Sequence, residues 1–291
     1  MNARIAASSN AGAVAATATT RLIARAAISS LWRELALYPK PGLVSLRDSG
    51  AHSDMDASTL IRSLFALSRY FSEIAEAGAA EAPFETLRAL GIRAESRMLD
   101  ATGGINTHRG AIFALGLLCA AAAWTRSRGE APVDAALRRA ARSQWGSTLT
   151  AAEIASKRSH GVRVMMRYGV AGARGEAAAA FPAVFQVALP ALRGALARGC
   201  DARLARVSAF FALLAHVDDT NILYRGGPKA LAFVRRRAQE FREAGDVDAS
   251  DALPRAEAIH REFVAQRLSP GGSADLLAAA MFVHEIQTTL Q

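Results

Sequence analysis

The chain has 291 residues, and a hydrophobic fraction of 51% excludes disorder over most of that length. Alanine is abundant while runs of β-branched and aromatic residues are few, so the composition favours helix over sheet. The formal net charge is +9, nearly all of it from arginine, which favours an anionic partner: a polyphosphate ligand, nucleic acid or an acidic membrane.

A repeated helix–loop–helix pattern follows the N-terminal segment. Residues 1–20 are rich in Ala, Ser and Thr, contain no acidic residue and lack the signature of a secretory peptide, so we expect a disordered tail there. Apolar residues recur at helical spacing from about Thr20 to Leu37, and two prolines then end this helix. Further helices are predicted from near Asp56, from Pro83 through Leu99, and over 111–124, 133–143, 148–157, 162–168, 182–198, 202–217, 228–243, 252–267 and 274–290.

The whole pattern predicts an all-α fold: a single multi-helix globular domain over 21–291, with functional loops at helix ends. No alternating strand pattern extends beyond a few residues, and no repeat is visible. The longest uncharged apolar run, Ala111–Trp124, is too short to span a bilayer and indicates a buried core helix. Cys119 and Cys200 lack a partner at metal spacing, which indicates buried thiols in a reducing compartment, so we expect a cytoplasmic protein that does not bind membranes.

The first polar loop, 38–56, is rich in titratable groups for a helical protein. These groups are Lys40, Asp48, His52, Asp54 and Asp56. His52, Asp54 and Asp56 alternate in a stretch too polar for a core, a pattern that suits metal binding or acid–base catalysis. The alternative is that Asp56, or less readily Asp54, only caps the helix that begins there.

Two glycine-rich loops suggest phosphate binding. The stretch 102–110 (TGGINTHRG) opens the buried helix, where free amides, glycines and a cationic side chain can hold a phosphate. A purely structural glycine turn is an equal alternative. The loops at 159–161 and 172–176 add a histidine, Arg174 and Glu176, which are either a surface pair or ligands of a phosphate and a hydroxyl.

Two more loops follow near the C-terminus. The run 210–215 is apolar on all sides, so it predicts a buried helix, and Asp218 and Asp219 follow directly after it. Adjacent carboxylates near a core need a metal ion or other cations, because burying unpaired charges is unfavourable. The alternative is an exposed helix end with solvated acids. The stretch 269–275 (SPGGSAD) opens the last helix, with Ser273 as a natural N-cap and two glycines that could let the backbone approach a ligand.

Together these loops resemble the triphosphoribosyl-dephospho-CoA synthase family, the CitG and MdcB proteins. The motifs that carry the resemblance lie in the family's order at 38–45 (YPKPGLVS), 50–55 (GAHSDM), 102–110, 172–177 (GARGEA), 219–227 (DTNILYRGG) and 269–277 (SPGGSADLL). The resemblance covers about 22–290. One departure is Ala180, where a glycine is expected, and the Asp48-Ser49-Gly50 form of the first loop resembles the malonate decarboxylase branch more than the citrate lyase branch.

The resemblance implies an all-helical enzyme that transfers the 5-triphosphoribosyl group of ATP to the 2′-hydroxyl of 3′-dephospho-CoA and releases adenine. A partner transferase would then attach the product to an acyl carrier protein. This chemistry needs a carboxylate beside the sugar, a base for the hydroxyl, and magnesium with cations for the triphosphate. We expect catalytic roles for Asp54, His52, Asp48 and Glu176. We expect substrate binding by Lys40, Gly103, Gly104, Asn106, His108, Arg109, Arg174, Asn221, Arg225, Gly226, Gly227, Gly271, Gly272 and Ser273. We expect magnesium at Asp218 and Asp219.

Two other functions fit part of the pattern. A magnesium-dependent N-ribosyl hydrolase would use the same loops with water as the acceptor. A basic helical protein that binds nucleic acid would use Arg235–Arg237 as its contact surface, although this function leaves the paired aspartates and the Gly-Gly loops unexplained.

Overall fold

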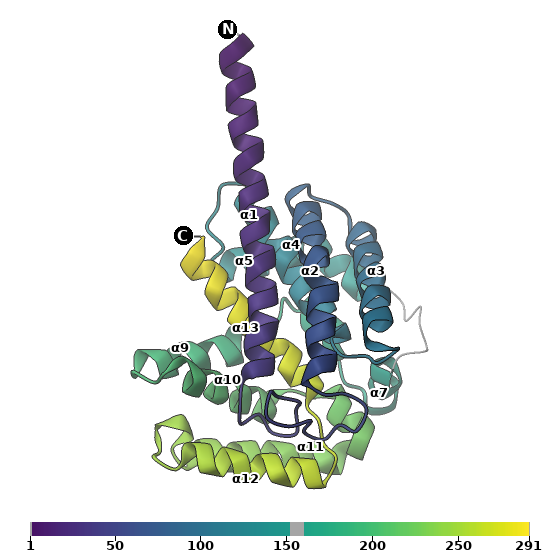
Figure 1. Cartoon of the computed structure of the whole chain (residues 1–291), viewed down its shortest axis with the longest axis vertical. Coiled ribbons are helices and arrows are strands. Elements are labelled where there is room, and N and C mark those ends of the chain that lie inside the picture. Colours follow the sequence, from purple (N-terminus) through teal and green to yellow (C-terminus); the bar gives the residue numbers. More distant parts are fainter. Residues whose placement is uncertain (1, 152–159, 291) are drawn as a thin grey trace.

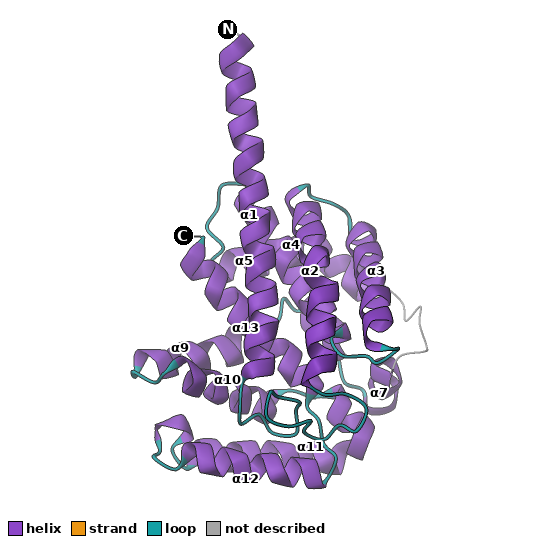
Figure 2. Ribbon diagram, viewed as in Figure 1, coloured by secondary structure: helices purple, strands orange, loops and turns teal. Residues whose placement is uncertain are grey.

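The structure is a computed structural model that describes residues 2–151 and 160–290. Within these two ranges it contains helices and no strand, which confirms the all-α fold (Figure 2). The helices of the first range are α1 (Asn2–Ala36), α2 (Ala57–Ala79), α3 (Phe84–Thr102), α4 (Arg109–Ser127), α5 (Asp134–Ala141) and α6 (Ser147–Ala151). Those of the second are α7 (His160–Tyr168), α8 (Gly172–Ala178), α9 (Leu189–Ala197), α10 (Ala202–His216), α11 (Thr220–Glu243), α12 (Ala252–Ala265) and α13 (Gly271–Thr289).

The helices form two groups, and the ends of the helices in the first group meet the sides of the helices in the second. Helices α1, α2 and α3 run side by side, and α10, α11 and α12 lie across their lower end (Figure 1). The loop that joins α1 to α2 lies at this junction, as does the start of α13 (Figure 1). Polar loops from distant parts of the sequence are therefore brought together where the two groups meet.

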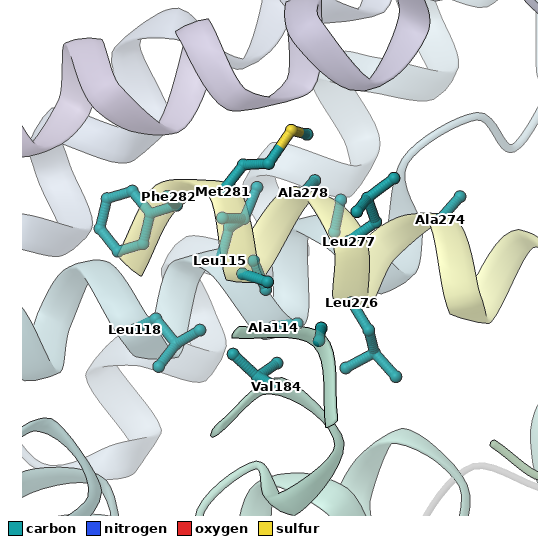
Figure 3. Close-up of a cluster of buried hydrophobic side chains, with 14 of the residues drawn as sticks. Ala114, Leu115, Leu118, Val184, Ala274, Leu276, Leu277, Ala278, Met281 and Phe282 are labelled. Carbon is teal, nitrogen blue, oxygen red and sulfur yellow. The ribbon is translucent and has the colours of Figure 1, made fainter. Parts of the chain in front are cut away.

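The core is built around α4 and α13, which are apolar on nearly all sides. Leu115 and Leu118 of α4 are fully buried, as are Leu277 and Phe282 of α13. Figure 3 shows these side chains gathered between the two helices, with Val184 beside them. By length and composition α4 could cross a membrane, but most of it lies inside the core, as the sequence predicts.

Several helix boundaries differ from the predicted ones. Helix α1 begins at Asn2 because its alanine-rich start has high helix propensity, and this part projects beyond the other helices (Figure 1). The disorder of residues 1–20 in solution stays a prediction. Helix α8 was predicted as a loop. Helix α11 begins at Thr220 and includes 225–229, with a break at Gly227, whose φ of 65° and ψ of −164° are not helical. The helix predicted over 148–157 lies partly outside the described residues, as does residue 159 of the loop predicted at 159–161.

Candidate active site

A cavity of about 1240 Å³ lies at the junction of the two helix groups. Its walls come from α1, α2, α3, α4, α7, α8, α10, α11 and α13 and from the loops between them. Most of the predicted site residues line it: Lys40, His52, Asp54, Asn106, His108, Arg109, Arg174, Glu176, Asp218, Asp219, Asn221, Arg225, Gly271 and Gly272. The fold therefore gathers polar groups that are up to about 230 residues apart in the sequence around one space.

His52 and Asp54 form a hydrogen-bonded pair on the cavity wall. The His52 Nδ1 atom lies 3.2 Å from Asp54 Oδ1, and the Nε2 atom lies 2.7 Å from Ser269 Oγ. Burial and the nearby Arg225 guanidinium lower the His52 pKa, so the imidazole is neutral at pH 7. A neutral imidazole beside an accessible carboxylate can accept a proton from a hydroxyl group.

Asp48 does not line the cavity. Its Oδ2 atom lies 3.3 Å from Nε2 of His260, and its Oδ1 atom accepts a hydrogen bond from the Gly50 amide. The Nδ1 atom of His260 in turn lies 3.1 Å from the Lys40 carbonyl oxygen. Through these contacts Asp48 and His260 hold the first loop in place, and the catalytic role expected for Asp48 stays a prediction.

Two of the predicted phosphate-binding cations already have partners within the protein. The Lys40 ammonium is fully buried and forms an ion pair with Glu34, and burial lowers its pKa. The Arg225 guanidinium donates to the carbonyl oxygens of Ala51 and Arg267, at 3.2 and 3.0 Å. Arg225 therefore joins the first loop to the loop before α13. Lys40 and Arg225 both help to fix the shape of the cavity and also contribute positive charge to it.

The Gly103-Gly104 turn ends α3 and does not line the cavity. Both glycines have positive φ, of 67° and 86°, and the Gly104 amide donates to the Leu99 carbonyl oxygen over 2.8 Å. This pattern is a Schellman-type helix end, in which glycine is favoured because it adopts positive φ without strain. The structure thus gives these two glycines a local structural role, the alternative that the sequence left open.

The side chains that follow this turn do reach the cavity. The Asn106 side-chain oxygen accepts from the Arg109 amide over 3.2 Å, and the Arg109 guanidinium pairs with Glu95. Across the cavity, a carboxylate oxygen of Glu176 accepts from the Ala183 amide over 2.6 Å. Burial raises the Glu176 pKa by more than this hydrogen bond lowers it, so the pKa is higher than usual. A raised carboxyl pKa suits a group that carries a proton in the reaction.

Asp218 and Asp219 lie at the start of α11 with different surroundings. Asp219 is buried, and its carboxylate accepts from the Asn221 and Ile222 amides and from the amide and hydroxyl of Ser273. Asp218 is half-exposed and pairs with Arg235 at 3.0 Å. The oxygens of Asp219 are fully engaged in joining α11 to α13, so the pair does not fit a ready two-carboxylate magnesium site. Among the described residues no three His, Cys, Asp or Glu side chains form a cluster suited to a metal ion.

The remaining glycines pack closely against their neighbours. A Cβ atom on Gly271 would lie 2.6 Å from the Asn221 side-chain nitrogen, so glycine is needed for the two helix starts to meet. Ser273 is buried as the third residue of α13, and Pro270, not Ser273, is the N-cap. Gly226 and Gly227 lie in α11 outside the cavity wall.

The sequence prediction that Asp56 is a helix cap is confirmed. Asp56 caps α2, because its side chain accepts a hydrogen bond from the Thr59 amide.

Two acidic residues of the cavity wall, Glu34 and Asp275, were missed by the sequence analysis. Asp275 accepts a hydrogen bond from the Ala111 amide, at the start of α4. Its Oδ2 atom is packed so closely on Gly110 that a Cβ there would lie 2.0 Å away. The signal in the sequence is an acid among the apolar residues at the start of the last helix, where a buried charge is unfavourable without a partner.

His108, the N-cap residue of α4, carries an unpartnered polar atom beside the same cavity. Its Nδ1 atom lies 2.7 Å from Ser63 Oγ, and Ser63 accepts from the Thr107 hydroxyl over 2.8 Å. The buried Nε2 atom of His108 has no hydrogen-bond partner among the residues that the structure describes. Burial lowers the His108 pKa to about 4, so the ring is neutral, and the hydroxyl chain favours the tautomer with the proton on Nε2.

Comparison with known proteins gives a consistent result. Residues 20–291 match the model of one family, CitG: ATP:dephospho-CoA triphosphoribosyl transferase. The chain is 40% identical over 270 residues to a 2-(5''-triphosphoribosyl)-3'-dephosphocoenzyme-A synthase of Pectobacterium atrosepticum, covering 89% of this chain and 87% of that protein. A protein of the same name from Klebsiella pneumoniae is 40% identical over 265 residues, covering 87% of each. No solved structure matches the chain. With nearly its whole length matched and the predicted motifs gathered around one cavity, the chain belongs to the ATP:dephospho-CoA triphosphoribosyl transferase family.

Proposed function

We propose that this enzyme transfers the 5-triphosphoribosyl group of ATP to the 2′-hydroxyl of 3′-dephospho-CoA, releasing adenine and forming 2′-(5″-triphosphoribosyl)-3′-dephospho-CoA. The observation that carries the proposal is the large cavity lined by the family motifs. Its volume of about 1240 Å³ exceeds the roughly 300–1,000 Å³ typical of a site for one small ligand. It therefore offers room for a donor and an acceptor at once.

The His52–Asp54 pair is the proposed base for the acceptor hydroxyl. The pair is accessible, and its imidazole is neutral, so it can take a proton as the new bond forms. Arg109 and Arg174, which both line the cavity, are the proposed partners of the triphosphate. Magnesium enters the proposal as the counter-ion of the ATP phosphates, part of the substrate complex.

The product is proposed to serve malonate decarboxylase in the cytoplasm. The Asp48-Ser49-Gly50 form of the first loop supports this branch, and a separate transferase would load the product onto an acyl carrier protein. In the source organism, loss of the gene should leave the carrier subunit of malonate decarboxylase without its prosthetic group. If the carrier subunit of malonate decarboxylase still carries its prosthetic group while that of citrate lyase lacks it, the product serves citrate lyase instead.

Mass spectrometry after incubation with ATP, magnesium and dephospho-CoA tests the proposed reaction. We expect one adenine released for each triphosphoribosyl-dephospho-CoA formed, and little product from CoA, whose 3′-phosphate crowds the neighbouring 2′-hydroxyl. Adenine release that does not depend on dephospho-CoA, with free ribose triphosphate as product, would instead support the hydrolase.

A further inference from the structure

The end of the cavity next to the α4 N-terminus has polar groups that the proposed reaction has not yet used. This α4 end is defined by His108, Gly110 and Asp275, all of which line the cavity. His108 is the N-cap of α4, and the carboxyl group of Asp275 lies against Gly110 and accepts from the next amide along the helix. Residues from α13 and α4 therefore meet at one wall.

The ionisable groups around Asp275 disfavour a negative charge on its carboxyl group. Glu34 on α1 and Asp219 at the start of α11 are the charged groups that act on it, and both are acidic. The nearby ammonium of Lys40 is bound to Glu34. Burial and these two acids raise the Asp275 pKa well above its usual value, against the effect of the Ala111 amide. The raised pKa favours the protonated carboxylic acid, the form that can donate a proton.

The buried Nε2 atom of His108 indicates what kind of ligand this wall receives. A buried N–H without a partner costs free energy, so a ligand that supplies an acceptor is favoured there. His108 and Asp275 both line this wall, and each can donate a hydrogen bond in the neutral form that burial favours. A heteroaromatic base with several acceptor nitrogens, such as adenine, matches this pattern better than a phosphate, which would be drawn to positive charge.

We propose that Asp275 is a catalytic acid of the transfer, which holds adenine at the α4 end of the cavity with His108 and protonates it as it leaves. The inference rests on the proposed function. The C1′–N9 bond breaks and its electron pair goes to adenine, while the Asp275 proton goes to N3 or N7 of the ring, so adenine leaves neutral. The 2′-hydroxyl oxygen bonds to C1′ and its proton goes to the His52–Asp54 pair. After release, water returns a proton to Asp275 and takes one from the pair.

The Asp275→Asn variant gives the first test. Asparagine keeps the size and the acceptor for the Ala111 amide but has no acidic proton. We expect turnover to fall at least ~10²-fold with the ATP Michaelis constant within a few-fold of wild type. The wild-type rate should also fall at alkaline pH as Asp275 ionises, and the variant should lack this decline. The matched control is Glu285→Gln on the same helix, which removes an ion pair with Arg33 outside the cavity and should keep full turnover.

Deaza analogues of ATP separate proton donation from positioning. With 7-deaza-ATP or 3-deaza-ATP, one ring nitrogen can no longer be protonated. One of the two should slow the wild-type enzyme strongly yet add no further loss to Asp275→Asn, because both changes remove the same proton transfer. If, for both analogues, the fold-decrease in rate caused by the analogue multiplies with that caused by Asp275→Asn, Asp275 is not the acid. The same holds if neither analogue slows the wild-type enzyme. The rates of the wild-type enzyme with the two analogues test the proposal even if the variant does not fold. A wild-type enzyme that makes product while Asp275→Asn keeps its rate overturns this inference alone, whereas no product at all overturns the proposed function.

Discussion

Gly110 is the residue whose small size allows Asp275 to reach the start of α4. A methyl group there would lie 2.0 Å from the Asp275 Oδ2 atom, so the Gly110→Ala variant must move the carboxyl group away. We expect turnover to fall by up to ~10²-fold, because a displacement of about 1 Å in a catalytic group has effects of that size. Steady-state kinetics at saturating substrates measures the loss.

A second glycine in a helix provides the control for this change. In Gly194→Ala, on α9, the new methyl group would meet only the end of the flexible Arg198 side chain, at 3.4 Å. This variant should keep wild-type turnover. Full activity in Gly110→Ala would show that the position of Asp275 is unimportant for the reaction.

Asp56 makes the stability of α2 depend on pH. Hydrogen bonds from the Thr59 amide and from the Ser58 and Thr59 hydroxyls lower its pKa from 3.8 to about 2. Because the folded-state pKa lies below the unfolded one, the stabilisation is fully present above pH 3.8 and is lost as the pH falls toward about 2. Asp56→Ala should therefore lower the melting temperature at pH 7 by more than at pH 3. An equal difference at both pH values would contradict a charged cap.

At the scale of elements, Asp219 joins the N-termini of α11 and α13 through four hydrogen bonds. Asp219→Asn removes the charge that these donors surround and should cost at least ~2 kcal/mol of folding free energy, since hydrogen bonds to buried charged groups are the strong ones. We expect a melting temperature lower by several degrees and an unchanged magnesium concentration for half-maximal rate.

The opposite outcome would restore the metal site predicted from the sequence. If Asp219→Asn keeps its melting temperature, needs more magnesium and regains turnover when magnesium is added, then Asp219 is a ligand and not a structural link. Melting curves and magnesium titrations on the same preparation decide between the two.

The sequence predicts helices well here because periodicity is a local property. The cap at Asp56 and the buried helix around 111–124 are readable from neighbouring residues. Contacts between helices are not local: Asp219 binds Ser273, 54 positions away, so one of the two acids that predict a metal site holds two helix starts together. The Gly103-Gly104 turn has the composition of a phosphate loop, but only its position at the end of α3 shows its structural role.

At the scale of the whole molecule, function depends on how the two helix groups meet. The cavity has walls from nine of the described α-helices, and the residues that line it come together only in the folded chain. A ligand that binds only the folded state adds stability, about 2.7 kcal/mol at 100 times its dissociation constant. ATP and dephospho-CoA should therefore each raise the melting temperature, while duplex DNA, the ligand of the nucleic-acid alternative, should not.

Whether the two substrates occupy the cavity together can be measured with the slow Asp275→Asn variant, in which both can be present without rapid turnover. Separate subsites add their binding free energies, so the shift with both ligands should approach the sum of the single shifts. Ligands that compete for one subsite give a combined shift little larger than that of the stronger binder. The same comparison in wild type with CoA in place of dephospho-CoA shows at which stage the 3′-phosphate is rejected. A full additive shift with CoA and no product would mean that CoA binds but its hydroxyl cannot reach C1′, whereas no shift would mean that CoA is excluded from the cavity.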